Sequence, residues 1–135
     1  MHHRFTGERT LMRIFFGERD RCTDGESKGK PLHEGLVRLF RDRDFAGATV
    51  FRGLAGFGAS ARMHTAHLID LSLDLPMVVE VVETEEKIQS ILPDLDRMIG
   101  GGLITLENVR VILYRPENVP ESERERHRIE GLQGQ

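Results

Sequence analysis

Several features that would assign this 135-residue sequence to a class of protein are missing or scarce. Its single cysteine, Cys22, excludes a disulfide within one chain, and a reducing, cytoplasmic location is the simplest expectation. No apolar run approaches the roughly 20 residues of a membrane-spanning helix, and the first residues lack the apolar core of a signal peptide. The formal net charge of -3 gives no bulk attraction for nucleic acid. We therefore expect one cytoplasmic domain without a nucleic-acid partner.

The common catalytic signatures are also missing. No Ser-His-Asp or Cys-His arrangement occurs at a suitable spacing, and no glycine-rich segment ends in the Gly-Lys-Ser or Gly-Lys-Thr of a Walker motif. The acidic residues fall on predicted helix surfaces or in the C-terminal segment, and they form no isolated carboxylate pair. The residues therefore mark no obvious catalytic centre, and we expect no enzyme activity.

Apolar periodicity predicts six elements. Short runs rich in β-branched and aromatic residues predict four strands, at residues 11–16, 47–52, 76–82 and 109–114. Apolar residues at helical spacing predict two helices, at residues 31–42 and 84–99. Pro31 suits the first turn of its helix, Thr84 suits a helix cap, and Pro93 is expected to kink the second helix. The order predicts an α+β, ferredoxin-like βαββαβ fold, with two helices on one face of a four-stranded antiparallel sheet.

Glycine and charge divide the chain further. We expect a flexible arm at residues 1–9, one domain at residues 10–115 and a charged, mobile tail at residues 116–135. A long loop from about Gly56 to Asp74 separates the second and third strands, and loops of this length in compact domains are usually functional or disordered. The third strand carries valine on both of its sides, which predicts that a second subunit covers the sheet face without helices.

Five motifs in order then suggest a family. They are residues 29–32 (GKPL), 47–53 (GATVFRG), 56–58 (GFG), 74–76 (DLP) and 102–107 (GLITLE). Together they resemble the PII-like signal-transduction proteins, in the branch catalogued as a domain of unknown function, and the resemblance covers residues 10–115. It implies a homotrimer that binds an adenine nucleotide (ATP, ADP or AMP) in clefts between subunits. It also implies a flexible loop that docks on a target protein, such as a membrane transporter or an enzyme.

The resemblance places the base of the cleft at Arg52, Gly53, Gly56 and Gly58, and its other side at residues 100–102, which are Gly100, Gly101 and Gly102. The residues themselves allow this, because glycine lets a ligand approach the backbone amides without meeting a Cβ. They allow a structural reading equally, in which the first glycines form a turn and the last ones end a helix.

Three basic residues are candidate phosphate partners: Arg52, Arg62 and Lys30. The only tyrosine, Tyr114, lies in the last predicted strand, so the covalent nucleotidylation of many standard PII proteins has no counterpart here. The usual 2-oxoglutarate and nitrogen-sensing role is therefore not expected.

Two other functions stay open at this point. In a helical loop, His64, His67 and Asp70 would form a two-histidine, one-carboxylate site, as in a trimeric divalent-metal-binding tolerance protein. A small nucleotide-processing enzyme that uses the same cleft is the second alternative. Cys22 would be a redox-sensitive thiol if Arg19 or Arg21 lowered its pKa.

Overall fold

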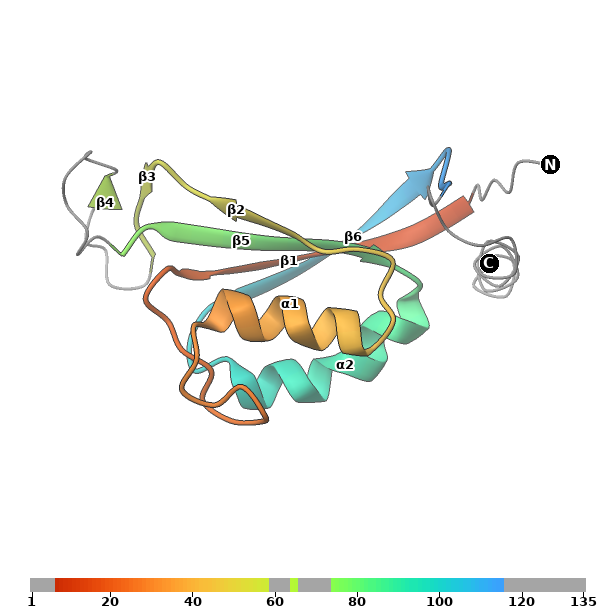
Figure 1. Ribbon diagram of the computed structural model, residues 1–135. Coiled ribbons are helices and arrows are strands. Elements are labelled where there is room, and N and C mark those ends of the chain that lie inside the picture. The colour runs from red at the N-terminus through yellow and green to blue at the C-terminus, as the bar shows by residue number, and fades with distance from the viewer. Residues whose placement is uncertain (1–6, 59–63, 66–73, 116–135) are drawn as a thin grey trace.

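The computed structural model describes residues 7–58, 64–65 and 74–115. Its main sheet has four antiparallel strands in the order β2-β5-β1-β6, and β3 and β4 form a separate two-stranded sheet. Both helices lie on one face of the main sheet (Figure 1). The elements are β1 (Gly7–Gly17), α1 (Leu32–Asp42), β2 (Thr49–Arg52), β3 (Ala55–Gly56), β4 (His64–Thr65), β5 (Pro76–Glu83), α2 (Glu85–Met98) and β6 (Leu103–Val111).

The predicted ferredoxin-like α+β fold is confirmed. Thr84 caps α2, because its side chain accepts a hydrogen bond from the Lys87 amide at 3.2 Å. Pro31 is the N-cap of α1 and does not lie inside its first turn as predicted. The helix α2 continues through Pro93 to Met98. Among the described residues, neither helix has the length and apolar character needed to cross a membrane.

Two strand boundaries and one loop differ from the prediction. The strand β1 begins at Gly7, so residues 7–9, expected in the N-terminal arm, belong to the sheet. The strand β6 spans Leu103–Val111, and the predicted range of 109–114 was wrong. Both errors have one cause: β1 and β6 pair continuously from Gly7↔Val111 to Phe15↔Leu103, and this backbone ladder extends through polar positions. The predicted long loop also contains the β3–β4 hairpin.

The core lies between the helices and the sheet. Alternate residues of β1 and β5 point toward the helices and are buried with the apolar stripes of α1 and α2. The largest fully buried side chains are Phe40, Met12, Ile14, Leu32, Leu36, Leu75, Ile88, Ile91, Leu95 and Val79. This core fixes the main sheet relative to the helices.

Cys22 belongs to this core. Its side chain is 3% exposed and packs beside Gly35 of α1, where any Cβ would overlap the sulfur atom. Burial raises the pKa of the Cys22 thiol. The hypothesis of a redox-sensitive thiol with a lowered pKa was therefore wrong, because neither arginine outweighs the loss of solvent around the sulfur.

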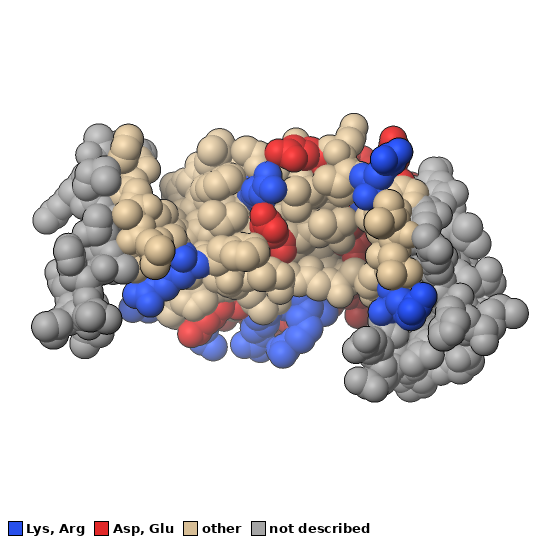
Figure 2. All heavy atoms as spheres, turned by 90° about the horizontal axis from the view of Figure 1, so that it is seen from above, with Lys and Arg blue, Asp and Glu red and all other residues tan. Residues whose placement is uncertain are grey.

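The open face of the main sheet, which is the face without helices, is largely apolar. Paired residues of antiparallel strands share a face, so one row across it consists of Phe51, Val78, Phe15 and Leu103. Phe51 is 49% exposed and Leu103 is 57% exposed. Figure 2 shows this face as a broad uncharged area with a small group of charged side chains near its middle.

That charged group is a cross-strand ion network. Arg13 of β1 donates to Glu80 of β5 at 2.8 Å and to Glu107 of β6 at 3.1 Å. The hydrogen bond to Glu80 raises the pKa of Arg13 further above its ordinary value. The three side chains satisfy one another, so the open face has a paired charge cluster inside an apolar surround.

Candidate functional site

One end of the main sheet collects the glycine segments selected from the sequence. In the antiparallel order, β1 and β2 end where β5 and β6 begin, and Figure 1 shows the connections after these strands at the same end of the molecule. We call it the Gly17 end. It contains Arg52 and Gly53 after β2, the β1–α1 loop (residues 18–31) with Lys30, and the turn of residues 99–102 before β6.

Gly53 and Gly56 have a structural reason to be glycine. A Cβ on Gly53 would lie 2.8 Å from Cγ of Pro76, and a Cβ on Gly56 would lie 3.1 Å from the same atom. The Gly53 amide donates to the Pro76 carbonyl at 2.7 Å, so this amide is already used. The structural reading therefore accounts for both glycines. Gly58 is exposed and has open space around its Cα.

Of the three basic residues predicted to contact phosphate, Arg52 is the one whose side chain has a described ion pair. Its guanidinium Nε donates to the Glu18 carboxylate at 2.6 Å, while the Arg52 side chain stays 61% exposed. Glu18 follows directly after β1, and its own amide donates to the Leu75 carbonyl at 2.8 Å. The ion pair thus spans the start of β5 and joins the ends of β1 and β2.

Residues 17–20 form a turn that holds both sides of the connection between β2 and β5. The Asp20 amide donates to the Gly17 carbonyl at 3.0 Å, and the Asp20 carboxylate accepts from the Gly17 amide at 3.1 Å. The Arg19 amide donates to the Asp74 carboxylate at 2.7 Å. Because Glu18 also contacts Arg52, this single turn is bonded to the last residue of β2 and to Asp74 and Leu75, the last two residues before β5.

The turn of residues 100–102 lies at the other edge of the sheet. All three glycines are exposed, and within the described part of the chain the amides of Gly100 and Gly101 have no hydrogen-bond partner. Gly102 must be glycine, because a Cβ there would lie 2.6 Å from the Phe15 carbonyl oxygen. The strands β2 and β6 are separated by β5 and β1. Three strand spacings, about 14 Å in total, therefore lie between the two glycine segments.

Of the remaining predicted residues, only Lys30 has a described side chain. Lys30 is exposed in the β1–α1 loop, where its carbonyl accepts from the Cys22 amide at 2.9 Å. Arg62, His67 and Asp70 lie outside the described residues, and of His64 only the backbone is described, in β4. Within the described ranges, no group of three or more His, Cys, Asp or Glu side chains is arranged to hold a metal ion. The metal alternative, which depends on the side chains of His64, His67 and Asp70, stays a prediction.

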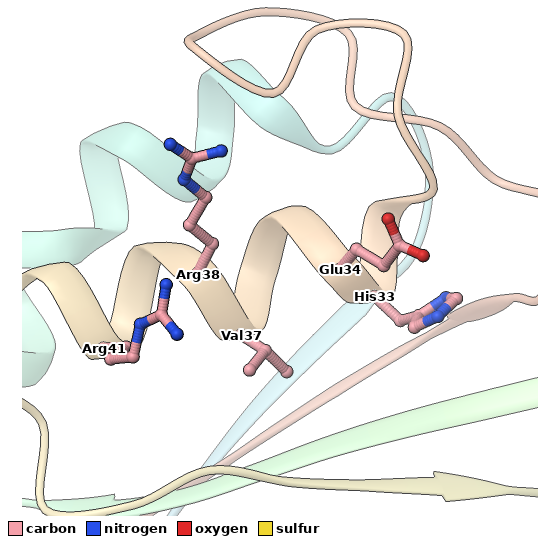
Figure 3. Close-up of a pocket in the computed structure, with 5 residues that line it drawn as sticks. All are labelled: His33, Glu34, Val37, Arg38 and Arg41. Carbon is pink, nitrogen blue, oxygen red and sulfur yellow. The ribbon is translucent and has the colours of Figure 1, made fainter.

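The structure also contains a shallow hollow of about 320 Å³ on the surface of α1. It is lined by five side chains of this helix: His33, Glu34, Val37, Arg38 and Arg41 (Figure 3). None of the residues predicted for the cleft lines it. Sequence reasoning missed it, although His33, Val37 and Arg41 recur every fourth residue and so share one flank of the helix.

Comparison with known proteins places the chain in a family. Residues 9–111 match the model of the DUF190 family, described as an uncharacterized ACR. A UPF0166 protein of Aquifex aeolicus (strain VF5) is 39% identical over 105 residues, which covers 78% of this chain and 94% of that protein. The family match therefore includes both glycine segments and the whole main sheet apart from the first residues of β1.

Two solved structures with the same fold come from PII-like proteins. One is a PII-like signalling protein from Thermus thermophilus, with a TM-score of 0.56 and 17% identity over 80% of this chain and 93% of that one. Another is CPII of Thiomonas intermedia K12, a nitrogen regulatory PII-like protein bound to ADP, AMP and bicarbonate, with a TM-score of 0.51 and 15% identity over 79% of this chain and 91% of that one. The protein thus belongs to the DUF190 family and shares the ferredoxin-like fold of these PII-like structures.

Proposed function

We propose that the protein is a PII-like regulator. It assembles as a homotrimer, binds an adenine nucleotide in the clefts between subunits, and controls a target protein through the connection between β2 and β5. The observation that carries this proposal is the position of the two glycine segments, at one end of the sheet but on opposite edges. One chain cannot bring them together, whereas two neighbouring chains can.

The apolar open face supports the assembly. Large apolar side chains on a protein surface are concentrated where another protein binds, and here they include Phe51, Val82 and Leu103. On its other face, which pairs with Met12 and Ile14, the edge strand β6 exposes Ile104 and Leu106, and an edge strand with exposed apolar side chains is a site for association. Covering the open face with copies of the same chain removes apolar surface from water, and a closed ring leaves no copy with an uncovered open face.

The chemistry of the Gly17 end supports an anionic ligand. The unused amides of Gly100 and Gly101 are donors for a phosphate oxygen. Across the subunit boundary, Arg52 offers a planar guanidinium, which matches a phosphate better than a lysine ammonium does. The presence of ADP and AMP in the structure of CPII supports an adenine nucleotide as the ligand.

Regulation follows from the position of this site. A ligand at Arg52 touches the residue just before the β2–β5 connection, and the turn of residues 17–20 ties Arg52 to the last residues of that connection. A nucleotide that binds one arrangement of the connection more tightly than another shifts the population toward it. No chemical step is needed, and a cytoplasmic location stays a prediction from the sequence.

Isothermal titration calorimetry with ATP, ADP and AMP tests the ligand. We expect saturable binding without turnover, weakened several-fold in Arg52→Gln and in Gly101→Val. The Gly101 position has open space for a larger side chain, so this variant folds but covers the amides. Gly47→Val is the matched control, because Gly47 also has open space but lies before β2, at the opposite end of the sheet. Equal affinity in all four proteins would contradict the proposed site, and hydrolysis of ATP would favour the enzyme alternative.

A further inference from the structure

Arg52 already has an anionic partner in the free chain. Its Nε lies 2.6 Å from Oε2 of Glu18, which is within the range of a charge-assisted hydrogen bond. Among the described residues, Glu18 is the only hydrogen-bond or ion-pair partner of this guanidinium. A phosphate oxygen would occupy the same kind of position that the carboxylate oxygen occupies now.

The carboxylate is held there by its backbone. The Glu18 amide is hydrogen-bonded to Leu75, the next amide is bonded to Asp74, and the Asp20 carboxylate closes the turn on Gly17. A Cβ on Gly17 would meet the Asp74 carboxylate at 2.7 Å, so the chain packs closely at this point. Because Glu18 is tethered next to Arg52, it acts as a competitor with a high effective concentration.

We propose that Glu18 occupies the anion-binding position of Arg52 in the free protein, and that displacement of Glu18 sets the affinity of the Gly17 end for an anionic ligand. This inference rests on the proposed function, because it concerns the same site. It adds a residue that no motif marks, and it explains how occupancy reaches the far side of the β2–β5 connection: the turn that loses its contact with Arg52 is the one bonded to Asp74 and Leu75.

The size of the effect follows from exposure. The Glu18 side chain is 29% exposed and that of Arg52 is 61% exposed, and exposed ion pairs are weak in solution. Removing the competitor should therefore tighten binding by a small factor, about two- to five-fold. A much larger change would require a buried pair, which this is not.

The test is a double-mutant cycle measured by calorimetry with ADP. We expect Glu18→Gln and Glu18→Ala to bind ADP about two- to five-fold more tightly than the wild type, and Arg52→Gln to bind it more weakly. In the Arg52→Gln background, Glu18→Gln should have no further effect, because its partner is gone. Glu86→Gln is the charge-matched control at the opposite end of the sheet, on the exposed first turn of α2, and its affinity should equal that of the wild type.

The outcomes separate this inference from the proposed function. If the wild type binds ADP and neither Glu18 variant binds it more tightly than the wild type does, the inference is wrong and the proposed function stands. The inference is also wrong if Glu18→Gln tightens binding equally with and without Arg52. If the wild type is silent but a Glu18 variant binds ADP, the inference is supported in its strongest form. Silence in the wild type and in both Glu18 variants overturns both.

Discussion

Gly35 offers a stability test in which the structure reverses the usual expectation. It lies inside α1, where glycine is normally about 0.5–1 kcal/mol less favourable than alanine. In this chain an added Cβ would overlap the Cys22 sulfur and would lie 3.1 Å from Cβ of Ser27 and 3.4 Å from Cε of Met98. Overpacking of this kind costs typically about 1–3 kcal/mol. We therefore expect Gly35→Ala to lower the free energy of unfolding by about 0.5–2 kcal/mol, despite its better helix propensity.

Urea unfolding followed by circular dichroism measures this change. Protein concentration must be held constant, because association shifts the apparent stability. The double variant Gly35→Ala, Cys22→Ala tests whether this overlap is the cause, since removing the sulfur opens the space that the new methyl group needs. We expect Gly35→Ala to cost less, or to stabilise, in the Cys22→Ala background. The reasoning is refuted if Gly35→Ala alone is as stable as the wild type, or if its cost is unchanged without the sulfur.

Three further predictions concern Cys22 and the open face. The Cys22 thiol should react slowly with a disulfide reagent in the folded protein and rapidly in urea. Burial raises the pKa of the thiol in the folded protein. The stabilisation linked to this pKa difference is complete below the unfolded pKa of about 8.5 and is lost as the pH rises through the folded pKa. Urea unfolding of Cys22→Ala at a series of pH values should lack this alkaline loss of stability, and a pH dependence equal to that of the wild type would contradict the prediction. Arg13→Ala leaves Glu80 and Glu107 without their shared cation, so size-exclusion chromatography should show a smaller trimer fraction at equal concentration than for the control Arg43→Ala; equal fractions would show that the open face is not the interface.

The sequence predicted the arrangement of the elements because their periodicities are strong. Alternating burial in β5 and the apolar stripes of the two helices correspond to the residues that form the core. The boundary of β6 was missed because an edge strand is defined by its backbone pairing with β1, and this pairing passes through exposed positions such as Asn108. Side-chain patterns do not report such a ladder.

Only part of the geometry of the candidate site could be predicted from the sequence. The structure brings the predicted glycine segments to one end of the sheet, but Gly53 and Gly56 pack on Pro76, a contact between the start of the β2–β5 connection and the first residue of β5. The partner of Arg52 is 34 residues away in sequence, and no local pattern links it to Glu18. The separation of residues 100–102 from Arg52 depends on the strand order, in which β5 and β1 lie between β2 and β6.

Native mass spectrometry of the purified protein with added ADP is the most direct measurement of the central claim, which is that ligand sites exist only between subunits. The account predicts an assembly of three chains that carries ADP, and it predicts that any monomer in the same spectrum carries none. A monomer that binds ADP by itself, or a trimer that stays free of ADP at saturating concentration, would contradict it.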